Sequence, residues 1–179
     1  IKLLHILKKG DIVVLLTEPP LFNVLAYPLI RLKKGVFFNW IFDLFPEVAV
    51  SAGLFSKTSI INRLLQKLRN YVFKRAEQNI VIGSRMFDYL VNLGVSAKNI
   101  NLIENWSNGD EIYPVSATDN NFRKDWGLEG KFVIGYSGNL GIAHDISTIL
   151  TVISTLRFNK NILFLFVGSG VRLDIVKKY

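Results

Sequence analysis

Short apolar runs alternate with longer stretches in which apolar residues recur at helical spacing. The first run, Asp11–Thr17, is rich in Val and Leu and ends at Glu-Pro-Pro, because proline cannot continue a strand. A second run, Val36–Phe42, is apolar on both of its alternating faces. The pattern predicts further strands at 79–83 and 101–103, and helices at 21–34, 58–77 and 85–93. Such an alternation is typical of a parallel sheet that helices cover on both faces.

The pattern breaks at residues 105–121, where NWSNGDEIYPVSATDNN is polar and rich in turn-forming residues. We predict an interdomain linker there, between a first domain at 1–104 and a second at 122–179. The alternation then resumes, with strands predicted at 131–137 and 162–167 and helices at 122–126, 145–157 and 171–179. The chain is therefore predicted to be α/β throughout.

Composition narrows the functions that the chain can have. An excess of 22 basic over 14 acidic residues gives a net charge of +8 and favours an anionic partner: a nucleotide, nucleic acid or acidic lipid. The absence of cysteine excludes disulfides and thiolate metal ligands, and two distant histidines, His5 and His144, do not suggest a metal site. No apolar run reaches the roughly 20 residues of a membrane-spanning helix. The chain starts with Ile and without a leader, so we read it as a fragment.

A turn in the second domain carries the most suggestive chemistry. At Gly138–Gly141 a strand runs into a helix, and backbone amides at such a turn can hold a phosphate group that glycines allow to approach closely. A tight turn without a ligand remains the alternative, because neither this turn nor Gly168–Gly170 has the three-glycine dinucleotide pattern. His144 comes shortly after this turn, and its side chain either contacts a ligand or has a structural role. Asp145 is best explained as a helix cap.

Two acidic residues follow the second strand of the first domain. Asp43 either caps the chain locally or faces a ligand, because ligands of open parallel sheets bind beyond the carboxyl ends of the strands. Glu47 could act with it as acid and base, but is explained more simply as favouring the positive end of a helix that begins near Pro46.

The predicted helix at 58–77 is amphipathic and basic. Apolar residues at helical spacing are expected to form its core face: Ile61, Leu64, Leu65, Leu68 and Val72. Six basic residues lie between Lys57 and Arg75 with no acidic residue among them, and Arg63, Lys67 and Lys74 share one face. That face either rests on an anionic membrane surface or is simply solvated.

Five segments, taken in order, carry a family resemblance. They are DIVVLLTEPPLF, FFNWIFDLFPEVAVSAGLF, IVIGSRMFDYLVNLGVSAKNINLIENW, YSGNLGIAHDISTIL and ILFLFVGSG, and they cover nearly the whole chain. In this order they resemble family 4 of the retaining glycosyltransferases, and especially its bacterial members for exopolysaccharide and O-antigen synthesis. The resemblance implies two Rossmann-like domains in the GT-B architecture, both incomplete in this chain.

The resemblance also implies a reaction. A hexose passes with retention from a nucleotide-diphosphate sugar, held by the second domain, to a saccharide or lipid-linked acceptor, held by the first, without a metal or other cofactor. The implied donor-binding residues are Gly138, Asn139, Gly141, His144, Gly168 and Gly170. The expected acceptor-side residues, each just after a strand, are Glu18, Pro20, Asp43, Ser84, Arg85 and Asn105. Asp43 and His144 are the candidate catalytic residues.

Three positions depart from the family pattern. His144 stands where many members carry a lysine, and Asn139 where many carry an arginine, which leaves a neutral loop. More of the phosphate charge must then be balanced by backbone amides. Phe42 precedes Asp43 where many relatives have a histidine.

Further expectations concern the setting of the protein. The resemblance implies a cytoplasmic protein, peripheral at the inner face of the plasma membrane. The family's opening strand and glycine loop are expected before Ile1 and its pair of glutamates after Tyr179, so we expect this piece to be inactive alone.

The residues leave two other functions open. One is a basic α/β module that binds nucleotide or nucleic acid without catalysis, and the other is a nicotinamide-dependent or regulatory domain. Nucleic acid is the less favoured partner, because the chain has no helix-turn-helix, RNA-binding aromatic motif or basic tail.

Overall fold

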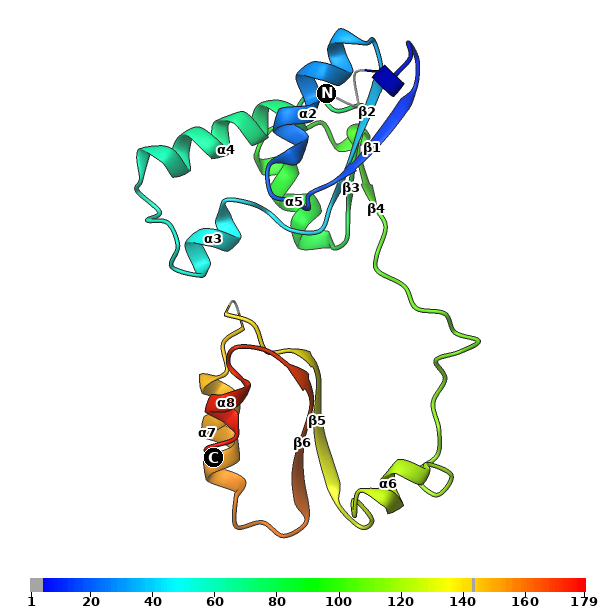
Figure 1. Ribbon diagram of the computed structural model, residues 1–179, viewed down its shortest axis with the longest axis vertical. Coiled ribbons are helices and arrows are strands. Elements are labelled where there is room, and N and C mark those ends of the chain that lie inside the picture. Colours follow the sequence, from blue (N-terminus) through cyan, green and yellow to red (C-terminus); the bar gives the residue numbers. More distant parts are fainter. Residues whose placement is uncertain (1–4, 143) are drawn as a thin grey trace. The chain divides into compact units, whose positions relative to one another are not determined.

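The chain divides into two compact units, Ile1–Trp106 (unit 1) and Ser107–Tyr179 (unit 2), in a computed structural model that describes residues 5–142 and 144–179 (Figure 1). The boundary falls inside the predicted linker at 105–121. Both units consist of parallel strands and helices, so the predicted α/β class is confirmed. The assignment of acceptor and donor roles to the two units stays a prediction.

Unit 1 contains a four-stranded parallel sheet. Its strands, in their order across the sheet, are β1 (Ile12–Leu16), β2 (Val36–Ile41), β3 (Gln78–Val81) and β4 (Ile100–Leu102). Every predicted strand of this part is therefore present. Because neighbouring strands are parallel, their carboxyl ends meet at one edge of the sheet.

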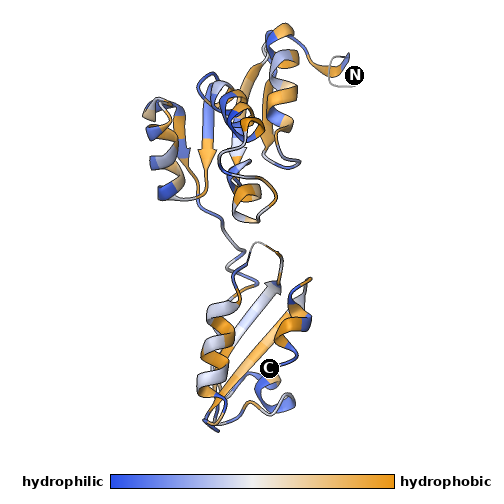
Figure 2. Cartoon of the chain, turned by 90° about the vertical axis from the view of Figure 1, so that its left-hand side faces the viewer, coloured by the Kyte–Doolittle hydropathy of each residue, from blue (hydrophilic) through white to orange (hydrophobic). Residues whose placement is uncertain are grey.

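The helices of unit 1 lie against one face of this sheet (Figures 1 and 2). They are α2 (Phe22–Leu32), α3 (Glu47–Ser51), α4 (Ile60–Phe73), α5 (Ser84–Asn92) and the short 3-10 helix η1 (Ala97–Asn99). Phe37 of β2 packs with Ile30 of α2. Ile41 of β2 packs with Phe73 of α4 and Leu90 of α5. Alternate residues of β2 thus face the helices, as its pleat requires.

No helix covers the other face of the sheet in the part of the chain that the structure describes. Val14 and Leu16 of β1 are 46% and 49% exposed there. Trp40 stacks on Phe42 and on Trp106, with ring centroids 5.8 and 6.1 Å apart. The prediction that helices cover both faces of the sheet is wrong for these residues. An apolar run shows that both faces of a strand are apolar, but it does not show what packs against each face.

A row of three buried asparagines crosses unit 1. Asn23 of α2 donates to Oδ1 of Asn39 at 3.1 Å, and Asn39 donates to Oδ1 of Asn79 at 3.0 Å. Asn79 in turn donates to the backbone carbonyl of Phe73 at 2.9 Å. All three side chains are at most 2% exposed. Buried amides are tolerated only when paired, so this row ties α2, β2, β3 and α4 to one another.

Helix α4 turns its polar residues inward. Asn62 and Arg69 are 1% and 2% exposed, whereas Ile61, Leu64 and Leu68 are 59%, 54% and 43% exposed. The prediction that these three apolar residues face the core is wrong. The helix is indeed amphipathic, but the inner face is set by Asn62, Arg69, Val72 and Phe73.

Unit 2 contains two parallel strands, β5 (Phe132–Asn139) and β6 (Ile162–Ser169). Its helices are α6 (Asn121–Asp125), α7 (Ser147–Leu156) and α8 (Leu173–Val176). A small core forms where Leu140, Ile146 and Val176 meet. The paired register places Gly138 beside Gly168 and ends with Asn139 beside Ser169, so both strands extend two residues beyond their predicted ends and the first glycine of each predicted turn lies within a strand.

The asparagine row is expected to contribute to the free energy of unfolding of unit 1. Replacing Asn39 by Leu leaves the Asn23 amide and the Asn79 carbonyl oxygen buried without partners, so we expect unit 1 to lose about 2 to 5 kcal/mol. Urea unfolding followed by the amide signals of unit 1 measures the loss. Asn101→Leu, at an exposed asparagine of β4, is the control and should change stability by less than about 0.5 kcal/mol. Equal stability of N39L and the unaltered protein would contradict the assigned role.

Candidate functional site

A pocket opens at the carboxyl ends of β1 and β2. It has a volume of about 330 Å³, and its lining includes Glu18, Pro20 and Asp43. These are three of the six predicted acceptor-side residues. Thr17 holds the two strand ends together, because its Oγ1 accepts from the amides of Phe42 at 3.1 Å and Asp43 at 3.3 Å. The pocket therefore presents two carboxylates beside a wall made by Pro19, Pro20, Phe45 and Val48.

The other three predicted acceptor-side residues do not line this pocket. Ser84 and Arg85 begin α5 after β3, and Asn105 lies beyond β4, all three with exposed side chains. They share the carboxyl-end side of the sheet with the pocket, as the topology requires. The structure thus brings together half of the set and leaves the rest as separate surface residues.

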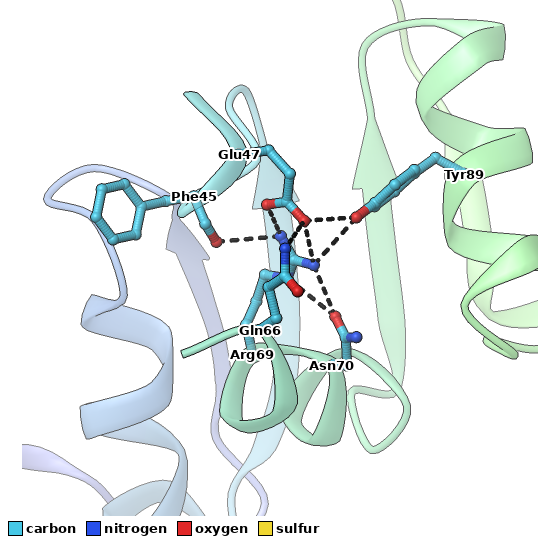
Figure 3. Close-up of polar contacts among 6 residues, drawn as sticks. All are labelled: Phe45, Glu47, Gln66, Arg69, Asn70 and Tyr89. Carbon is cyan, nitrogen blue, oxygen red and sulfur yellow. Dashed lines mark hydrogen bonds and ion pairs between the residues drawn. The ribbon is translucent and has the colours of Figure 1, made fainter. Parts of the chain in front are cut away.

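Arg69 of α4 lies buried beneath this region, 2% exposed (Figure 3). Its guanidinium binds the Glu47 carboxylate of α3 with both terminal nitrogens and donates to the backbone carbonyl of Phe45 at 3.1 Å. It also donates to Oδ1 of Asn70 at 2.8 Å and to the Tyr89 hydroxyl of α5 at 3.3 Å. One side chain therefore connects α3, α4, α5 and the turn that leaves β2.

Glu47 is fully engaged in this cluster. The Tyr89 hydroxyl donates to its Oε1 at 2.6 Å, and Gln66 donates to the same oxygen at 3.3 Å. Burial opposes the charged form of Glu47, but the bonds from Arg69 and Tyr89 and the Arg69 charge outweigh it and lower the pKa of Glu47. The simpler, structural explanation of Glu47 is supported. Its main partner is a buried arginine, however, rather than only a helix end.

Sequence reasoning missed Arg69, which it counted only as one of the six basic residues between Lys57 and Arg75 and to which it gave no role. A usable signal was present: Arg69 lies three and four residues before the buried Val72 and Phe73, and therefore shares their helix face. Burial also raises the pKa of Tyr89, as does its bond to Glu47.

The glycines at the end of β6, Gly168 within the strand and Gly170 just after it, have a structural explanation. Gly168 and Gly170 have φ values of +146° and +132°, and a Cβ on either would lie 2.0 Å from the Gly138 carbonyl oxygen or 2.5 Å from that of Leu140. The two turns can therefore pack backbone against backbone only with glycine at these positions. Both glycines thus hold the first turn in place. Their assignment to donor binding stays a prediction.

In the turn after β5, two backbone amides already have hydrogen-bond partners within the protein. The Leu140 amide donates to the Ser169 carbonyl at 2.7 Å, and the Gly141 amide donates to Nδ1 of His144 at 3.3 Å. The expectation that the amides of this turn are open to a phosphate is therefore wrong for these two. No atom lies within 4 Å of a Cβ placed on Gly138, and the Asn139 and His144 side chains are exposed, so this side of the turn is open.

Asp145 bonds to the first residue of α7, although the N-cap position itself is held by Ile146 and not by Asp145 as predicted. Its Oδ1 accepts from the Ser147 amide at 2.9 Å and from the Ser147 hydroxyl at 2.6 Å. These bonds lower the pKa of Asp145. Asp145 is thus occupied by the helix, and the exposed His144 beside it is the titratable group that the turn offers to a ligand.

In the part of the chain that the structure describes, no helix is long and apolar enough to cross a membrane. Within the described residues, no group of three or more His, Asp or Glu side chains gathers as a metal site. Arg63, Lys67 and Lys74 are exposed on α4, beside the exposed Ile60, Ile61, Leu64 and Leu68.

The cluster around Arg69 makes a pH prediction. Since the pKa of Glu47 is lowered in the folded protein, its contribution to stability is fully present above its ordinary value of 4.5 and is lost as pH falls through the folded value. Glu47→Gln should cost about 3 to 5 kcal/mol at pH 7, because it leaves Arg69 buried without its counter-charge.

Denaturant unfolding at several pH values measures this contribution. The stability gap between E47Q and the unaltered protein should shrink below pH 4.5, whereas Glu104→Gln, at an exposed glutamate, should show no gap at any pH. A gap that stays constant down to the acid limit would refute the ion-pair assignment.

Comparisons with known proteins show what the chain resembles. No family model matches the chain. It is 33% identical over 182 residues to a probable glycosyltransferase, WbjE, of Pseudomonas aeruginosa, and this match covers 100% of the chain but 44% of that protein. The chain thus spans less than half the length of this curated relative.

Two crystal structures of HepE from Anabaena share the fold. The one in complex with UDP has a TM-score of 0.66 at 15% identity and covers 94% of this chain and 43% of its own. The one with UDP and glucose has a TM-score of 0.59 at 15% identity and covers 87% and 40%. At this identity the likeness concerns the fold alone. The sequence match over the entire chain confirms the resemblance to glycosyltransferases, and the chain is a homologue of part of the probable glycosyltransferase WbjE.

Proposed function

We propose that this chain is part of a retaining glycosyltransferase that moves a hexose from a nucleotide-diphosphate sugar to a saccharide or lipid-linked acceptor in surface polysaccharide synthesis. The observation that carries the proposal is the 33% identity to the probable glycosyltransferase WbjE over the entire chain. The fold neighbour HepE, whose crystal structures contain UDP and UDP with glucose, supports a nucleotide-sugar donor. The proposed reaction uses no metal.

Unit 2 is proposed to hold the donor diphosphate at the open side of the turn after β5. Gly138 leaves room for a phosphate group, Asn139 and His144 offer exposed hydrogen-bond donors, and Gly168 and Gly170 fix the turn from behind. Because two amides of the turn are already engaged, the side chains carry more of the phosphate binding than the sequence suggested. Donors fixed at the leaving group stabilise the negative charge that develops there.

Unit 1 is proposed to hold the acceptor in the pocket beside Glu18 and Asp43. Carboxylates accept hydrogen bonds from sugar hydroxyls, and the apolar wall around Phe45 suits the C–H face of a sugar ring. In the reaction, the bond between the anomeric carbon and the phosphate oxygen breaks as the acceptor oxygen bonds to the same face of that carbon, and the hydroxyl proton passes to the departing phosphate oxygen. Asp43 is proposed to accept a hydrogen bond from the attacking hydroxyl.

Helix α4 is proposed to rest on an anionic membrane surface in the cytoplasm. Ile60, Leu64 and Leu68 form an exposed apolar row at a spacing of four residues. Arg63 and Lys67 directly precede Leu64 and Leu68, and Lys74 follows the last residue of α4; all three are exposed. An apolar row flanked by cations is the pattern of a helix that lies in the headgroup region of a bilayer.

Nucleotide binding tests the donor site directly. Titration with UDP, GDP or NAD should move the amide signals of Gly138 and Gly141 with at least one nucleoside diphosphate and not with NAD. His144→Ala should weaken that binding by about tenfold or less, the value of one hydrogen bond. His5→Ala removes the histidine of unit 1 and should leave the titration unchanged. Failure of every nucleoside diphosphate to shift these signals would sink the donor assignment.

Flotation with vesicles tests the membrane face. Reversing the charge of Arg63, Lys67 and Lys74 to Glu should reduce binding to anionic vesicles by more than tenfold, at about 1 kcal/mol per basic residue. The control reverses the exposed Lys160, Lys177 and Lys178 of unit 2 and so changes the net charge equally. Equal loss in both triple variants would reduce the effect to net charge and remove α4 as the contact.

A further inference from the structure

Tyr136 of β5 lies directly beside His144. Its ring stacks on Phe166 of β6, with centroids 6.0 Å apart, and meets the His144 ring edge-on at 6.4 Å. Tyr136 also packs against the small core around Leu140 and Ile146. The ring is therefore fixed by packing, and its hydroxyl has a defined position at the exposed turn.

Two donors converge on one nitrogen of His144. The Tyr136 hydroxyl lies 3.0 Å from Nδ1, and the Gly141 amide nitrogen lies 3.3 Å from the same atom. The hydroxyl is also 3.3 Å from the Asn139 carbonyl oxygen, which is the more distant acceptor. Nδ1 is thus enclosed by the turn itself, while the side chain as a whole is exposed.

These contacts determine which nitrogen carries the proton. A backbone amide can only donate, so Nδ1 must offer its lone pair to Gly141. A neutral imidazole with an unprotonated Nδ1 carries its hydrogen on Nε2. The Tyr136 hydroxyl, whose nearer acceptor is Nδ1, then donates to it as the second partner. The ring is left with an outward N–H donor that no side chain of the described residues occupies.

We propose that Tyr136 is a positioning residue that, with the Gly141 amide, locks His144 as an Nε2–H donor for a phosphate oxygen of the nucleotide donor. The proposal rests on the proposed donor site. It assigns a role to a tyrosine that the sequence left without one, and it explains why the Gly141 amide is engaged. The Gly141 amide does not bind the phosphate itself. It orients His144, which is then a neutral donor to the phosphate with a fixed direction.

Nitrogen-15 spectra of the imidazole rings test the lock without any ligand. The chain has only two histidines, so His5→Ala identifies the His144 signals. In the unaltered protein at neutral pH, Nδ1 should show the shift of an unprotonated nitrogen and Nε2 that of an N–H. Tyr136→Phe keeps the ring but loses the hydroxyl, and should move the signals toward the tautomer mixture of free histidine. Tyr179→Phe, at an exposed tyrosine, should move nothing.

A His144 proton on Nδ1, or a tautomer unaffected by Tyr136→Phe, would overturn the proposal. UDP titration of the same samples separates it from the donor site. Y136F should weaken UDP binding by about tenfold or less in the unaltered background and not at all in H144A, since the two residues act as one unit. A locked tautomer without UDP binding would support the lock and refute the donor site. Additive losses in Y136F and H144A would refute the lock alone.

Discussion

The buried charge of Arg69 constrains unit 1 more than any other single interaction. A guanidinium removed from water must keep a counter-charge and fill its donors, and here Glu47, Phe45, Asn70 and Tyr89 supply the partners. Three helices and the turn after β2 must hold fixed relative positions to do so. With Arg69 and Asn62 facing inward, helix geometry turns Leu64 and Leu68 outward. The exposed apolar row of α4 is thus a consequence of its polar inner face.

The same interaction reaches the pocket at the carboxyl ends of β1 and β2. Arg69 binds the Phe45 carbonyl, and Phe45 lines the pocket two residues after Asp43. The position of the Asp43 segment is also fixed by Thr17, which accepts from the Asp43 amide. The pocket therefore has a rigid floor and a rigid side, although both come from turns. Such support is what a residue that receives a sugar hydroxyl needs.

Much of the fold could be predicted because apolar runs and helical spacing are local signals. Every strand, and the bond of Asp145 to the first residue of α7, follow from short stretches of sequence. Burial of a charged residue is not local, because Arg69 depends on Glu47 and Tyr89 from two other helices. Within the candidate site, the turn after β5 could be located from its glycines, but the role of Tyr136 depends on how the turn folds back. The close packing of Gly168 against Gly138 could not be predicted either, because it depends on the backbone of a neighbouring strand.

The contact between the two glycine turns also restricts the motion of these turns within unit 2. With the Gly168 backbone pressed against Gly138, and the Leu140 amide bonded to the Ser169 carbonyl, neither turn can shift without displacing the other. Arg172, just before α8, donates its amide to the Leu140 carbonyl and joins the same body. A displacement that begins at the end of β5 is thereby passed to the first turn of α8, so the two loops behave mechanically as one rigid part.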